Sequence, residues 1–128
     1  MVDGADDAWA VLRTLQALID GRDLDGLVEF FDGGVLIGTS GDGRDRAGVR
    51  RYLEAVVGQP GELRWDWTEV IPFHQTEDTV GFAAFGDVVL AGTGSESREA
   101  IRMTGFAVRD GGRWRLRQFH GSIAFGGP

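Results

Sequence analysis

The chain has 128 residues, a length that suits one domain able to bury a core without disulfides or metal ions. It contains no cysteine, which excludes disulfides and thiolate metal sites. The net charge of −7 argues against nucleic-acid binding, because a phosphate backbone requires clustered Lys and Arg. No apolar run approaches the roughly 20 residues of a membrane span, and the opening residues 1–4 are acidic rather than signal-like. We therefore expect one cytoplasmic domain over residues 1–128, with no membrane and no nucleic-acid partner.

The first half of the sequence predicts three helices. Apolar residues recur there at three- and four-residue spacing, which places them on one face of a helix. Each helix begins at an aspartate, whose carboxylate accepts hydrogen bonds from the free N–H groups of the first turn. The predicted starts are Asp6 or Asp7, Asp23 and Asp45, and the first and third helices stop at Gly21 and Gly58. A short strand over 35–39 and a turn over 40–44 separate the second helix from the third.

The second half predicts a sheet of long strands. Apolar and polar residues alternate there, as they do when successive side chains face opposite sides of a sheet. The predicted strands cover 63–74, 79–90, 98–108 and 113–122. The turns between them are Thr76–Asp78, Gly92–Ser97 and Asp110–Gly112. Glycines inside the strands permit sharp bending, so we expect a strongly curved antiparallel sheet.

One face of the last predicted strand carries Trp114, Leu116, Gln118, His120 and Ser122. Trp114 and Leu116 are too apolar to face water, so alternation turns this face inward and brings His120 into a pocket near Trp67 and Tyr52. Histidine titrates near neutral pH and serves as an acid or a base. The alternative is a structural histidine bonded to a neighbouring hydroxyl or backbone group. A bulge at Gly121 would reverse the direction of the side chain.

The order of these elements resembles the NTF2-like superfamily, in its SnoaL-like branch. The segments that carry the resemblance are Arg22–Leu27 leading into Phe30-Phe31, Val35–Thr39, Arg46–Val57 and Trp114–Ser122. The resemblance implies an α+β cone, in which three N-terminal helices pack on a strongly curved antiparallel sheet around a small-molecule pocket. It also implies frequent dimerisation through the sheet. Members include ketosteroid isomerases, polyketide cyclases, dehydratases, epoxide hydrolases and the association domain of a calmodulin-dependent kinase.

The resemblance leaves two kinds of function open, and whether the protein is an enzyme is not decided by it. The first is a small-molecule-binding protein with isomerase, cyclase or dehydratase chemistry, in which His120 is the acid or base and Asp66 or Glu69 its carboxylate partner. An epoxide-hydrolase-like set would use Asp66, Asp87 and Arg102. The alternative is a non-catalytic dimerisation or ligand-binding module, similar to the kinase association domain.

The residues predicted to line the pocket favour a small apolar or ring-bearing ligand. These ligand-binding residues are Trp9, Tyr52, Trp65, Trp67, Phe82, Arg102, Phe106 and Gln118. The same aromatic side chains would also fill an ordinary core, and Arg102 would also suit the outer surface. No cofactor and no metal are expected, because two isolated histidines without cysteine form no ligand cluster. We expect a homodimer that packs the outer sheet faces together, with Phe119 and Val70 exposed there.

Overall fold

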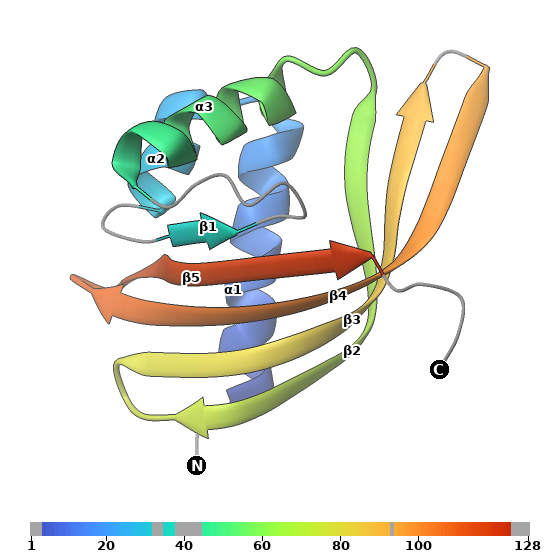
Figure 1. The fold of residues 1–128 in the computed structure, drawn as a ribbon. Coiled ribbons are helices and arrows are strands. Elements are labelled where there is room, and N and C mark those ends of the chain that lie inside the picture. The colour runs from blue at the N-terminus through green and yellow to red at the C-terminus, as the bar shows by residue number, and fades with distance from the viewer. Residues whose placement is uncertain (1–3, 32–34, 38–44, 93, 124–128) are drawn as a thin grey trace.

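The computed structural model of the protein describes residues 4–31, 35–37, 45–92 and 94–123. Three helices cover one side of a curved sheet (Figure 1). The helices are α1 (Gly4–Asp20), α2 (Leu24–Phe30) and α3 (Arg46–Val57). The strands are β1 (Val35–Ile37), β2 (Glu62–Gln75), β3 (Thr79–Gly92), β4 (Ser95–Asp110) and β5 (Arg113–Ile123). None of the described helices combines the length and the apolar character needed to cross a membrane.

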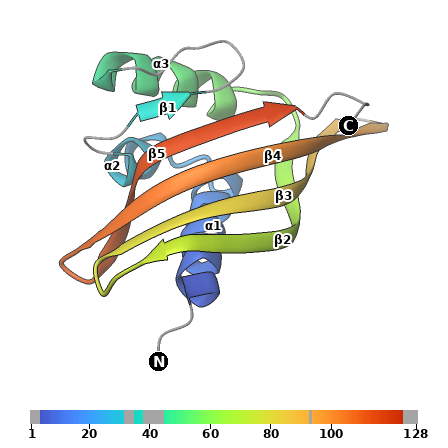
Figure 2. The same cartoon turned by 60° about the horizontal axis from the view of Figure 1, so that its bottom comes forward.

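The sheet has the strand order β1-β5-β4-β3-β2. Strands β2 to β5 form an antiparallel meander that curls around α1 (Figure 2), which confirms the predicted curved sheet. At one edge the short strand β1 adds to this antiparallel sheet, and it pairs with β5 in parallel. This pair joins residues far apart in the sequence through a long crossover, so local patterns do not reveal it. The predicted turn at Gly92–Ser97 is also too long, and residues 38–44 lie outside the described part.

Two of the three predicted helix caps are confirmed. The Asp23 carboxylate accepts a hydrogen bond of 2.9 Å from the Gly26 N–H at the start of α2. The Asp45 carboxylate accepts one of 2.7 Å from the Gly48 N–H at the start of α3. Each bond satisfies a backbone donor that the first helical turn leaves without an internal partner.

The predicted cap of the first helix is wrong, because α1 begins earlier, at Gly4. Asp6 and Asp7 therefore lie within its first turn, where the helix dipole favours negative charge. Asp7 accepts a hydrogen bond of 2.9 Å from the Gln75 amide and forms an ion pair of 3.2 Å with Arg109. These two contacts attach the beginning of α1 to β2 and β4.

The sheet bends where β2 contains an extra residue between Trp67 and Glu69. Gly86 of β3 lies opposite Trp67, and its backbone approaches β2 closely. A Cβ atom at Gly86 would lie only 2.1 Å from the Asp66 carbonyl oxygen. A side chain has no room there, so the bend depends on glycine at this position.

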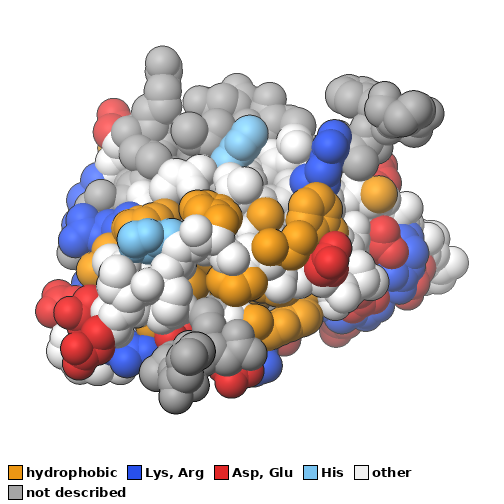
Figure 3. Space-filling model, turned by 90° about the horizontal axis from the view of Figure 1, so that it is seen from below, with side chains coloured by type: hydrophobic (Ala, Val, Ile, Leu, Met, Phe, Trp, Pro, Cys, Tyr) orange, Lys and Arg blue, Asp and Glu red, His pale blue; other side chains and the backbone are white. Residues whose placement is uncertain are grey.

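The hydrophobic core lies between the three helices and the inner face of the sheet. Phe119 is only 7% exposed, and Val70 packs against the same core, so their predicted exposure on the outer face is wrong. The outer face instead exposes Ile71 (44%) and Phe73 (64%). Figure 3 shows hydrophobic side chains gathered across the middle of this face, among histidine and charged side chains.

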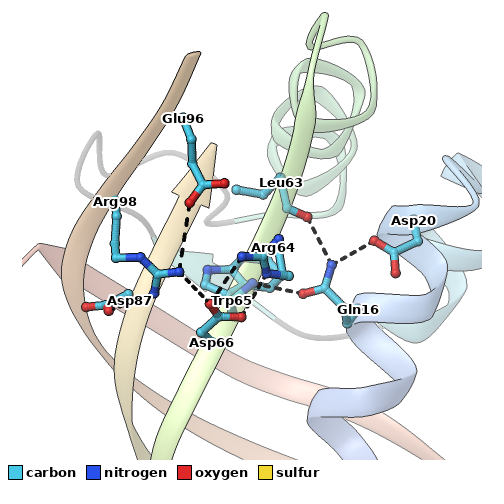
Figure 4. A network of polar contacts seen from close by, with 9 residues as sticks. All are labelled: Gln16, Asp20, Leu63, Arg64, Trp65, Asp66, Asp87, Glu96 and Arg98. Carbon is cyan, nitrogen blue, oxygen red and sulfur yellow. Dashed lines mark hydrogen bonds and ion pairs between the residues drawn. The ribbon is translucent and has the colours of Figure 1, made fainter. Parts of the chain in front are cut away.

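The free edge of β2 is held by the side chain of Gln16 on α1 (Figure 4). The Gln16 amide nitrogen donates to the Leu63 carbonyl at 2.9 Å, and the Gln16 oxygen accepts from the Trp65 N–H at 3.0 Å. The same nitrogen also donates to Asp20 at 2.9 Å. Gln16 thus supplies the donor and the acceptor that a further strand would supply, which protects the edge from pairing with another chain.

Candidate ligand site

A small apolar cavity of about 40 Å³ lies between α1, α3 and the inner face of the sheet. Its described lining comes from both helices, the end of α2 and strands β2 and β5. The lining residues are Leu15, Ile19, Phe31, Tyr52, Leu53, Val56, Leu63, Trp65 and Phe119. Tyr52 brings the one hydroxyl group of this described lining. Its phenol is protonated at neutral pH and can donate a hydrogen bond, and burial raises its pKa further.

Aromatic side chains form one wall of the cavity. The Phe119 ring contacts Trp65 at a centroid distance of 6.3 Å and Phe31 at 5.9 Å, the latter nearly edge-to-face. Trp67 stacks behind Trp65 at 6.3 Å, with the two rings 13° from parallel. Such ring pairs hold one another in fixed orientations. Of the predicted ligand residues, the structure brings Tyr52 and Trp65 into the lining and places Trp67 directly behind it.

The other predicted ligand residues lie elsewhere. Phe82 is fully buried in the core, and Trp9 is half-buried on α1 outside the cavity lining. Arg102 is exposed on β4. Phe106 and Gln118 are half-buried partners on neighbouring strands, on the outer side of the sheet. The aromatic residues of the sequence therefore predict an apolar interior. They do not show which of these residues fill the core and which line the cavity.

His120 is exposed on the outer face, so its predicted direction into the pocket is wrong. The cause is a bulge, because Arg117 is an extra residue of β5 relative to β4. Before the bulge Leu116 faces the core, and after it Phe119 does, which turns His120 outward. The bulge lies earlier than Gly121, where the sequence makes one possible, and it reverses the direction of the side chains from Arg117 onward. His120 is therefore not placed to act as an acid or base in the cavity.

Asp66 belongs to a group of ion pairs outside the cavity (Figure 4). Its carboxylate contacts Arg64 at 2.8 Å and Arg98 at 3.0 Å, and Arg98 also contacts Asp87 at 3.0 Å. The hydrogen bond from Arg64, aided by Arg98, lowers the pKa of Asp66. A catalytic base working near neutral pH needs the opposite shift. Asp87 pairs with Arg98 rather than Arg102, so the epoxide-hydrolase-like set is not assembled.

Acid should weaken the contribution of Asp66 to stability. Because the pKa of Asp66 is lowered in the folded protein, this contribution is present above the ordinary carboxyl pKa of about 3.9 and is lost as the pH falls through the folded value. We expect Asp66→Asn to lower the melting temperature by a few degrees at pH 7, and the difference from wild type to vanish in acid. Thermal unfolding of both proteins from pH 7 to pH 2 measures this difference in melting temperature. Asp110→Asn, at the exposed end of β4, is the control, and a difference in melting temperature that is unchanged in acid would contradict the assignment.

Sequence reasoning missed most of the apolar lining. Helical periodicity identifies Leu15 and Ile19 as inward residues, but it does not show that a void lies beside them. Strand alternation predicts Phe119 on the outer face, because the sequence does not reveal the bulge that turns it inward. Within the described residues, no three His, Asp or Glu side chains are grouped to hold a metal ion.

A curved sheet wrapped around a long helix, with shorter helices over one end, defines an NTF2-like fold. An NTF2-like protein of unknown function in nutrient uptake from Rhodospirillum rubrum is similar at a TM-score of 0.69 and 21% identity, covering 90% of this chain and 96% of that one. ActVI-ORFA from Streptomyces coelicolor has a TM-score of 0.75 at 16% identity, with coverages of 93% and 96%. A candidate scytalone dehydratase from Novosphingobium aromaticivorans has a TM-score of 0.76 at 11% identity, with coverages of 94% and 86%.

The SnoaL-like domain family matches residues 10–126, which is most of the sequence. The chain belongs to this family. No curated protein matches the chain. At identities below 25%, the similar structures establish the fold and do not transfer an activity.

Proposed function

We propose that the protein binds a small apolar or ring-bearing molecule in the cavity beneath α3. The observation that carries this proposal is the lining itself, in which Trp65, Phe119 and Phe31 surround a void with Tyr52 as its polar group. Binding sites for small molecules are usually apolar, with a few placed polar groups that fix orientation. The Tyr52 hydroxyl is suited to that orienting role, because a phenol is protonated at neutral pH and burial raises its pKa further.

The cavity must widen to accept a ring. Its volume of about 40 Å³ is close to the space of one water molecule in the liquid, about 30 Å³, whereas ligand sites usually measure about 300–1,000 Å³. Val56 and Leu63 are half-buried at its border, so they can move with less disruption than the buried Leu15 and Leu53. We infer that these two side chains shift when a ligand enters.

The lining favours binding over acid–base catalysis. Among the described lining residues, no carboxylate and no imidazole is present to transfer a proton at neutral pH. His120 and Asp66, the predicted catalytic residues, both lie outside the cavity. One similar structure is a candidate dehydratase, but the similarity is one of fold and does not supply a carboxylate or imidazole in this cavity.

Filling the cavity should weaken binding. We expect Val56→Phe to weaken binding of indole by about tenfold or more, because the added ring occupies the space that the ligand needs. A nuclear magnetic resonance titration measures this, following the backbone amides of α1, α3 and β2.

The matched control is Ile71→Phe, which adds the same ring on the outer face and should leave indole binding unchanged. Saturable shifts around the cavity in wild type, lost in Val56→Phe alone, support the proposal. Equal binding by all three proteins, or shifts confined to the outer face, would contradict it.

We also propose that two copies of the chain pair through the outer face of the sheet. Ile71 and Phe73 are exposed there. Glu69 and Arg102, both exposed, flank Phe85 on neighbouring strands of this face. In a two-fold arrangement, Glu69 of one copy can face Arg102 of the other, so the surface is complementary to itself. These features favour a homodimer with an apolar centre and a charged rim.

Light scattering at tens of micromolar tests this assembly. We expect a dimer for wild type and a monomer for Phe73→Asp, because a buried unpaired carboxylate is costly. Glu77→Gln, in the exposed turn between β2 and β3, is the control and should remain dimeric. A wild-type protein that stays monomeric would exclude the assembly.

A further inference from the structure

A second hollow adjoins the apolar cavity at the end of α1. It is a surface cleft of about 350 Å³, and it shares Ile19, Val56 and Leu63 with the cavity lining. These three side chains are therefore the wall between an apolar interior and a polar vestibule. A movement of Val56 or Leu63 would join the two spaces into one site of the usual volume for a small ligand.

Arg22 gives the cleft a fixed hydrogen-bond donor. Its guanidinium donates to the carbonyls of Val57 at 2.5 Å, Gln59 at 2.8 Å and Gly61 at 2.7 Å, which lie at the end of α3 and in the connection that follows it. Its backbone adopts the unusual φ of 49°, which directs the chain away from the end of α1. A guanidinium has five N–H donors, so these three bonds leave two for a ligand.

The cleft carries charges of both signs. Asp20 and Glu62 line it together with Arg22 and Arg64. Asp20 is held by the Gln16 amide at 2.9 Å, while Arg64 is paired with Asp66 outside the cleft. An ionic group of either sign would therefore meet like as well as opposite charges, so the cleft offers it little net attraction to offset the loss of its hydration. An uncharged group with a donor and an acceptor, such as a hydroxyl, can donate to the carboxylates and accept from the guanidinium.

We propose that the ligand is an uncharged amphiphile, with its apolar end in the cavity and its hydrogen-bonding end in the cleft. This inference rests on the function proposed above, since it assumes that the cavity accepts the apolar end. Val56 and Leu63 form the passage between the two parts. Arg22 is the residue that positions the polar end, because its guanidinium is fixed by three backbone carbonyls.

Four probes that share one ring and chain test the proposal: propylbenzene, 3-phenylpropan-1-ol, 3-phenylpropanoate and 3-phenylpropylamine. We expect the alcohol to bind about tenfold more tightly than either ion, because the mixed charges of the cleft do not offset the hydration that an ion loses on binding. In the double variant Asp20→Asn/Glu62→Gln, the affinity for 3-phenylpropanoate should rise about fivefold. The two carboxylates that oppose the positive charge of Arg22 are then gone. Propylbenzene, which has no polar end, should bind both proteins equally.

Both substitutions keep the shape of the side chain, and the amide oxygen introduced by Asp20→Asn can still accept the hydrogen bond from Gln16. The matched control is Glu77→Gln/Asp78→Asn, which removes two exposed charges beyond the opposite end of β2 from the cleft. It should leave the affinity for 3-phenylpropanoate unchanged. If propylbenzene binds but the alcohol has no advantage over the ions, or the double variant does not favour the anion, the amphiphile proposal is wrong and the proposed function stands. If no probe binds at all, the proposed function fails with it.

Discussion

Gly86→Ala is expected to lower the free energy of unfolding by about 3 kcal/mol, the upper end of the usual cost of overpacking. The added methyl group would lie 2.1 Å from the Asp66 carbonyl oxygen and 2.8 Å from the Trp67 Cα atom. Both are backbone atoms of β2, so no side-chain rotation can relieve the overlap. Strands β2 and β3 must separate at the bend, which also displaces Asp66 from Arg98.

Gly92→Ala is the matched control for this prediction. A Cβ atom there would lie 3.9 Å from the Ser95 hydroxyl oxygen, at an ordinary contact distance. We expect its free energy of unfolding, measured by urea denaturation, to stay within about 0.5 kcal/mol of wild type. Similar stability for Gly86→Ala and Gly92→Ala would show that the close approach of β2 to Gly86 does not exist.

Phe82→Ala is expected to lower the free energy of unfolding by about 3–5 kcal/mol, as large-to-small substitutions at buried aromatic residues do. The ring is fully buried and packs against Gly105, where a Cβ atom would lie 2.6 Å from the ring's Cζ atom. Removing the ring leaves a void between α1 and the middle of the sheet, which the close-packed side chains of the core can fill only in part. The melting temperature should fall by roughly 10–20 °C.

Phe73→Ala is the control for this core substitution. The Phe73 side chain is 64% exposed on the outer face, so the same truncation should change the melting temperature of the monomer little. Its effect should appear in the association of two copies instead. A melting temperature that falls equally for Phe82→Ala and Phe73→Ala would contradict the placement of the core on the inner face.

The sequence predicted the elements of the fold well because their causes are local. Asp23 and Asp45 begin helices since their carboxylates reach N–H groups only three residues away. The bend at Gly86 follows from glycine within a strand pattern. The parallel pairing of β1 with β5 was not predictable in this way, because it depends on the path of the chain between distant residues.

The site was harder to predict than the fold because strand alternation fails at a single inserted residue. Nothing in the sequence around Arg117 indicates a bulge. Because this extra residue is present, Phe119 borders the cavity and His120 faces outward. Tyr52 and Trp65, which lie before that point in the chain, are the two predicted ligand residues that the structure places in the cavity lining. The partners of Asp66 lie on two strands, so its place among ion pairs required the sheet register.

Binding in the cavity can be seen in a crystal structure of the protein soaked with propylbenzene. We expect electron density for the ring between Tyr52, Trp65 and Phe119, with Val56 or Leu63 displaced to make room for it. Density for the ring on the outer face beside Phe73, above an unchanged cavity, would contradict it.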